Sequence, residues 1–223
     1  MRRESSTVVG LAGEIDERFL ARLAQSPNVS VARAPAAASE PAAASKPAAA
    51  SKPAGLAPAP RPAWEAGAQA MREAARRRST YVLVADDPLA DVAAGWRAMW
   101  DLTRGPGGAA QFEERAAEAL AAWRDKRFEL PDYYLVLAGA APGGTGPDLY
   151  LGPLRAVRPR RVALAATPGS PAAADSPAAQ AESLLDTLRA LEHGPWWPPL
   201  DELIDSARHF YAGGLTESQL TGA

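Results

Sequence analysis

Seven residues of this sequence have side chains or backbone freedom suited to binding a small ligand. Asp86 and Asp87 are adjacent carboxylates, and Glu14 is a third acidic residue that follows an apolar segment. Carboxylates of this kind bind divalent cations and amines. The other four residues form a glycine-rich loop whose backbone amides could bind an anion; they are Gly143, Gly144, Thr145 and Gly146.

Each of these features also has a plainer structural interpretation. Asp87 is followed by a proline, and an aspartate before a proline is typical of a helix N-cap. The glycine-rich loop has the composition of a flexible connector. For both features the structural interpretation is favoured, which leaves Asp86 as the strongest candidate for a ligand contact.

The motifs of the common catalytic classes are missing from the sequence. It has no P-loop and no G-x-S-x-G nucleophile elbow. The segment Gly10–Gly13 is followed at once by acidic residues that would repel a pyrophosphate. With no cysteine and only His193 and His209, which we interpret as structural, the sequence predicts no metal site, no cofactor and no recognisable catalytic set.

Five short β-rich segments alternate with helical patterns, and this alternation must position the candidate residues. The last three strands are almost continuously apolar, as expected for strands buried on both faces of a parallel sheet. The five predicted strands are Thr7–Leu11, Val29–Ala32, Thr80–Ala85, Tyr133–Ala138 and Val162–Ala166.

This pattern predicts an α/β fold, a Rossmann-like three-layer sandwich around a five-stranded, mostly parallel sheet. Among the known arrangements the flavodoxin-like order 2-1-3-4-5 fits best. Ligands of such sheets bind outside the carboxyl ends of the strands. We therefore expect Glu14, Asp86 and the glycine loop to line one cleft at that edge.

A proline–alanine segment interrupts the predicted domain. Prolines at positions 35, 41, 47 and 53 recur every six residues, a spacing that stops any helix the alanines would start. We expect a disordered linker over residues 34–62, inserted into a single domain made of residues 1–33 and 63–215. Residues 216–223 are expected to form a flexible tail.

Composition restricts the partners that the protein could have. Hydrophobic residues make up 47% of the chain and charged residues 22%, with a net charge of −2, so a dedicated nucleic-acid binder is not expected. No apolar run is long enough to cross a membrane. The sequence favours a cytoplasmic protein, and its richness in alanine, arginine and proline is typical of bacterial genomes of high GC content.

Two basic clusters and one aromatic pair suggest contact surfaces. Arg76–Arg78 precede the third strand, and a second cluster at positions 158, 160 and 161 precedes the fifth. Both are expected to complement the carboxyl ends of helices, with a patch that binds nucleic acid or an acidic partner as the alternative. Trp196 and Trp197 lie between two predicted helices, where they would either lock these helices together or anchor a partner.

Two function classes follow from these observations. The first is a non-catalytic binding or interaction module of a cytoplasmic bacterial assembly, which binds a protein partner or a small anionic ligand. The second is an enzyme that acts on a small anionic or phosphorylated metabolite at the carboxyl edge of the sheet. The absence of every strong catalytic motif favours the first class.

Overall fold

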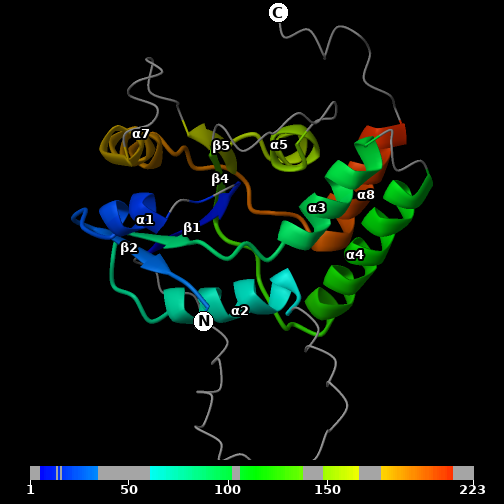
Figure 1. The fold of residues 1–223 in the computed structure, drawn as a ribbon, viewed down its shortest axis with the longest axis horizontal. Coiled ribbons are helices and arrows are strands. Elements are labelled where there is room, and N and C mark those ends of the chain that lie inside the picture. The colour runs from blue at the N-terminus through cyan, green and yellow to red at the C-terminus, as the bar shows by residue number, and fades with distance from the viewer. Residues whose placement is uncertain are drawn as a thin grey trace, which may run out of the picture.

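The computed structural model describes residues 6–13, 15, 17–34, 61–101, 106–137, 148–165 and 177–212. Its centre is a sheet of five strands, all of which run parallel (Figure 1). The strands are β1 (Thr7–Ala12), β2 (Val29–Ala32), β3 (Tyr81–Val84), β4 (Tyr133–Leu137) and β5 (Val162–Ala165). The predicted α/β fold with a five-stranded parallel sheet is confirmed.

The strand order is β2-β3-β1-β4-β5. It differs from the expected order 2-1-3-4-5 because β1 and β3 have exchanged places. β1 pairs with β3 on one side and with β4 on the other, while β2 pairs only with β3 and forms one edge. Val9 and Leu11 of β1 are as deeply buried as Leu83 of β3. Because both strands are apolar and interior, their hydrophobic patterns could not show which one lies beside β2.

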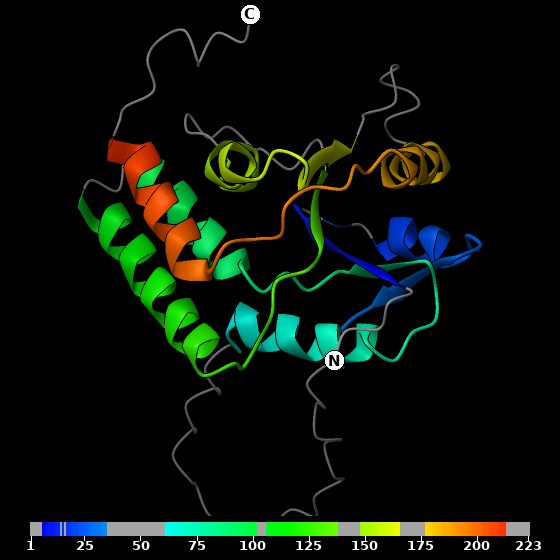
Figure 2. The ribbon, with the colours of Figure 1, turned by 180° about the vertical axis from the view of Figure 1, so that it is seen from behind.

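Right-handed crossovers place the helices on the two faces of the sheet. The chain passes from β1 outward to β2 and then returns, so α1 (Glu17–Leu23) and α2 (Ala63–Ala74) lie on opposite sides of the sheet (Figures 1 and 2). On the α1 side, α7 (Pro177–Arg189) packs against α1 and completes an apolar layer that includes Leu20, Leu184 and Leu188.

The helices on the α2 side enclose a larger core. A hairpin of α3 (Ala90–Trp100) and α4 (Pro106–Arg124) packs closely because glycines stand at the contacts; a Cβ on Gly95 would lie 2.9 Å from the Cα of Phe112. Trp96 is fully buried within this core. A π-helical turn, η2 (Tyr150–Leu154), packs against β4 and β5 and continues into α5 (Arg155–Val157).

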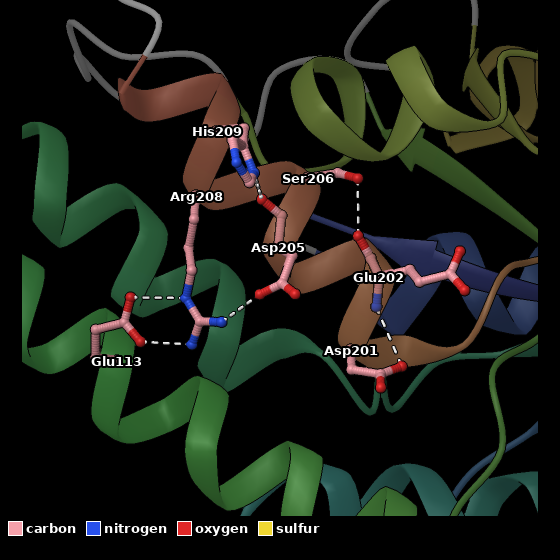
Figure 3. Close-up of polar contacts among 7 residues, drawn as sticks. All are labelled: Glu113, Asp201, Glu202, Asp205, Ser206, Arg208 and His209. Carbon is pink, nitrogen blue, oxygen red and sulfur yellow. Dashed lines mark hydrogen bonds and ion pairs between the residues drawn. The ribbon is translucent and has the colours of Figure 1, made fainter.

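The last helix, α8 (Leu200–Ala212), is fastened to α4 by an ion-pair network (Figure 3). The Arg208 guanidinium donates to both carboxylate oxygens of Glu113, at 3.0 and 2.7 Å, and to Asp205 on its own helix at 2.6 Å. Glu113 is the main cause that raises the pKa of Arg208 above its ordinary value. Because these side chains are exposed, the network orients α8 more than it stabilises the fold.

The connector between α7 and α8 is bound by the second arginine cluster and by Trp197. The buried Arg161 donates to the carbonyls of Gly194, Pro195 and Asp132 at 2.6, 3.0 and 3.0 Å. Trp197 is buried and donates to the Pro131 carbonyl at 2.8 Å. Trp197 therefore locks the connector to the sheet, whereas Trp196 is 41% exposed with its ring against the Arg161 guanidinium.

Several predicted segments lie outside the described residues, including residues 35–60 of the expected linker and the tail 216–223. Within the part of the chain that the structure describes, no helix is both long and apolar enough to span a membrane.

Candidate functional site

The carboxyl edge of the sheet holds two of the seven predicted ligand contacts. Glu14 and the loop Gly143, Gly144, Thr145 and Gly146 lie outside the described residues. Asp86 follows β3, and its Oδ2 accepts a hydrogen bond from the Ala34 amide at 2.6 Å. Asp86 therefore fastens the end of β2 to the end of β3, a structural contact that the sequence did not reveal.

Asp87 is buried, and both of its carboxylate oxygens accept hydrogen bonds. Oδ1 accepts from the Leu89 amide at 2.9 Å, in a turn that leads into α3 at Ala90. Oδ2 accepts from the hydroxyl of Tyr150. Burial raises the pKa of Asp87 to about 6, although these hydrogen bonds act in the opposite direction.

Two tyrosines complete this cluster, and neither was among the predicted site residues. Tyr134 of β4 is fully buried, and its ring centroid lies 5.0 Å from that of Tyr150. Its hydroxyl makes no hydrogen bond of normal geometry with any described residue. Burial, and then the nearby charge of Asp87, raise the pKa of both tyrosines well above the ordinary value.

The sequence carried one signal for this cluster. Tyr134 is a polar-tipped residue inside an otherwise apolar buried strand, where a tyrosine hydroxyl usually needs a partner. Space for its ring comes from β1, because a Cβ on Gly10 would lie 2.9 Å from the Tyr134 ring. Asp87, whose charge helps to raise the pKa of Tyr134, is 47 positions away in the sequence, and only the fold brings the two together.

The described carboxylates of this edge thus accept hydrogen bonds within the protein. Asp148 accepts hydrogen bonds from the Tyr150 and Leu151 amides, at 2.8 and 3.2 Å, and caps η2. No group of three or more acidic or histidine side chains among the described residues is arranged to hold a metal ion. The cluster around Asp87 stabilises the junction of β3, β4 and η2.

A different surface, at the β2 edge of the sheet, presents a groove of about 670 Å³. One wall is the face of α1 that carries Leu20, Ala21 and Ala24. The opposite wall comes from α2 and the residues just after it, and Val31 and Arg33 lie along the edge strand between the walls. The walls follow from helical spacing, because positions three and four apart share one helix face.

The backbone of β2 has hydrogen-bonding groups that point into this groove. The Asn28 carbonyl accepts a hydrogen bond from the Tyr81 amide of β3. The Ala32 carbonyl accepts one from the amide of Ala85, the residue after β3. In a parallel ladder the backbone groups of successive residues alternate in direction. Those of Val31 and Arg33 therefore point away from β3, toward the open side of the sheet.

The α2 wall of the groove is basic. It carries Arg72, Arg76 and Arg77 with a single carboxylate, Glu73, which lies 2.8 Å from Arg77 and 3.5 Å from Arg76. Arg72 is exposed and pairs with no carboxylate among the described residues. On the α1 side, the Arg33 guanidinium donates to both oxygens of Glu17, at 2.6 and 2.7 Å, which leaves that wall close to neutral.

The groove was not predicted as a site. For the cluster Arg76–Arg78 the sequence favours a helix-end role, with contact to nucleic acid or to an acidic partner as the alternative. The missing information was the strand order and the position of β2 at the edge. Comparisons with protein-family models, with curated proteins and with solved structures found no match to this chain.

Proposed function

We propose that the protein is a non-catalytic binding module of a cytoplasmic assembly, and that it binds an extended polypeptide segment at the β2 edge by strand addition. The observation that carries this proposal is the outward-facing backbone of Val31 and Arg33 along the floor of a groove. An edge strand with free amides and carbonyls is a template for one further strand.

The walls of the groove favour a strand as the ligand. Helices α1 and α2 stand on opposite sides of the sheet, so they enclose the space that a sixth strand would fill next to β2. The strand β2 itself is only four residues long. A bound segment would therefore pair along a short, defined stretch of β2.

Proline substitution tests this function directly. A library of random displayed peptides is panned on the immobilised protein, and the affinity of the enriched peptide is measured by fluorescence anisotropy. Val31→Pro removes the outward amide, and proline is tolerated on edge strands when its nitrogen faces outward. We expect Val31→Pro to weaken binding by about tenfold or more, because the variant cannot donate to the added strand.

Val31→Ala is the matched control, because it shortens the same side chain and keeps the amide. It should bind within about twofold of the wild type, and both variants should show cooperative thermal unfolding. Failure to enrich any peptide above the bare support, or equal binding by Val31→Pro and Val31→Ala, would contradict the proposed function.

An enzyme acting on a small anionic or phosphorylated metabolite is the second candidate, and one observation favours it. The pKa of Asp87 is raised to about 6, a range in which a carboxyl can act as a general acid or base. Against this role, Asp87 is buried with both oxygens bonded inside the protein. If this candidate holds, nucleotides, sugar phosphates or Mg²⁺ should raise the melting temperature of the wild type, and Asp86→Asn should remove the effect.

A further inference from the structure

The two walls of the groove differ in chemistry, and this difference specifies a partner. The inference rests on the proposed strand addition at β2. Successive side chains of a β-strand point to opposite faces of the sheet. A strand added beside β2 would therefore direct every second side chain toward α1 and the others toward α2.

The side chains directed toward α2 meet a net positive surface. Arg72, Arg76 and Arg77 stand against the single carboxylate of Glu73, so acidic side chains are favoured at these positions of the partner. Toward α1 the partner meets Leu20, Ala21 and Ala24, together with the neutral Arg33–Glu17 pair. That wall favours small apolar side chains.

The spacing of the arginines agrees with the spacing of a strand. Arg72 lies in α2, and Arg76 follows Ala75, which keeps helical dihedral angles just past the end of the helix. Four residues at the helical rise correspond to about 6 Å along the axis. Side chains two residues apart on a strand are separated by about 6.6–6.8 Å. Two acidic residues at positions i and i+2 of the partner can therefore each meet one of these arginines.

A second copy of this chain is a poor occupant of the groove. If two β2 edges paired about a twofold axis perpendicular to the sheet, α2 of each copy would lie on the same face of the joined sheet. The α2 arginines would then face one another. Like charges in this position disfavour edge-to-edge pairing, as they do on other protected edge strands.

We propose that the β2 groove recognises an extended polypeptide segment in which acidic residues alternate with small apolar residues, the acidic ones facing Arg72 and Arg76. A single-stranded nucleic acid would satisfy the arginines but would leave the outward backbone groups of Val31 and the apolar α1 wall without complementary contacts. An extended segment with alternating acidic residues would pair with the backbone of β2 and would complement both walls of the groove.

Three synthetic peptides and two double variants test this proposal by fluorescence anisotropy. One peptide alternates glutamate with valine, the second has the same composition with the glutamates grouped in a block, and the third has lysine in place of glutamate. We expect the wild type to bind the alternating acidic peptide about tenfold or more tightly than either of the others. Arg72→Glu with Arg76→Glu should reverse the charge preference and favour the lysine peptide.

The matched control is Arg97→Glu with Arg124→Glu, which changes the net charge equally at exposed positions of α3 and α4 that do not line the groove. It should bind the acidic peptide like the wild type. If Val31→Pro abolishes binding while the Arg72 and Arg76 double variant keeps its charge preference, strand addition stands and the acidic partner is wrong.

Other outcomes overturn the proposal in different ways. Binding that depends on the arginines but is unchanged by Val31→Pro would contradict strand addition itself. Equal binding of the alternating and block peptides would contradict the two-walled recognition, and so would tighter binding of a single-stranded oligothymidylate than of the alternating peptide. Absence of measurable binding by the alternating peptide would refute the inferred partner.

Discussion

At the scale of single residues, the carboxyl edge of the sheet illustrates how a functional pattern can serve the fold. Asp86 and Asp87 follow a parallel strand at the place where many α/β proteins bind ligands. Here Asp86 accepts from the Ala34 amide, and Asp87 accepts from the Leu89 amide and the Tyr150 hydroxyl. These contacts connect β2, β3 and η2, and they explain why polar residues occupy a strand end next to an apolar core.

The raised pKa of Asp87 predicts that the free energy of unfolding depends on pH. It is raised from 3.8 to about 6 in the folded protein, so the folded state holds this proton more tightly than the unfolded chain does. The stability that this contributes is fully present below about pH 4 and is lost as the pH rises through about 6. Relative to Asp87→Asn, the wild type should lose about 2 kcal/mol of unfolding free energy between about pH 4 and pH 7.

The measurement is urea unfolding of both proteins across this range, with the difference between them plotted against pH. The difference cancels the other titrating groups, because both proteins share them. Two curves that remain parallel from about pH 4 to pH 7 would show that the pKa of Asp87 is not raised in the folded protein.

At the scale of the elements, several helices approach the rest of the protein only because glycines stand at the contacts. Gly67 of α2 lies against the turn before α3, where an added Cβ would be 2.6 Å from backbone atoms of Pro88. This contact sets the position of α2, and α2 carries the basic wall of the groove. Asp91 of α3 reinforces it by accepting from the Ala63 amide at 2.7 Å.

Gly67→Ala should therefore destabilise the protein by about 1–3 kcal/mol through overpacking, although alanine is the better helix former by about 1 kcal/mol. Gly107→Ala is the matched control, because a Cβ on Gly107 of α4 would meet nothing within 4 Å. Thermal or chemical unfolding measures both. Equal stabilities for the two variants would mean that α2 can shift away from Pro88 at little cost.

The same elements show how much the sequence could predict. Strand and helix positions could be predicted from hydrophobic periodicity. Short apolar runs such as Tyr81–Val84 and Tyr133–Leu137 are typical of buried strands, and the structure has strands there. The strand order did not follow, because β1 and β3 are equally apolar and both can lie in the interior. The groove depends on that order, so the sequence indicated the cluster Arg76–Arg78 without the edge strand beside which Arg76 and Arg77 lie.

At the scale of the whole molecule, the residues next to segment 35–60 of the expected linker belong to the described domain. Residues on both sides of this segment are held by the described domain: the Ala34 amide donates to Asp86, and Arg61 donates to Gln69 at 2.9 Å. Long insertions in surface loops cost little, because loop-closure entropy rises slowly with length.

Replacing residues 35–60 with a Gly/Ser loop of about ten residues should change the melting temperature by only a few degrees. The shortened protein should also bind the alternating acidic peptide like the wild type, since none of the groove residues is removed. Calorimetry and anisotropy check the two expectations. Loss of cooperative unfolding would mean that the segment packs on the domain.

Residue-resolved hydrogen exchange tests the proposed strand addition most directly. Amide exchange is followed by NMR in the free protein and in the presence of the alternating glutamate–valine peptide. Strand addition predicts that the peptide slows exchange of the Val31 and Arg33 amides, which face the groove. The amides of Ser30 and Ala32 should change less, because the ladder alternation directs them toward β3. Bound peptide that leaves the Val31 and Arg33 amides exchanging at their free rates would contradict strand addition at β2.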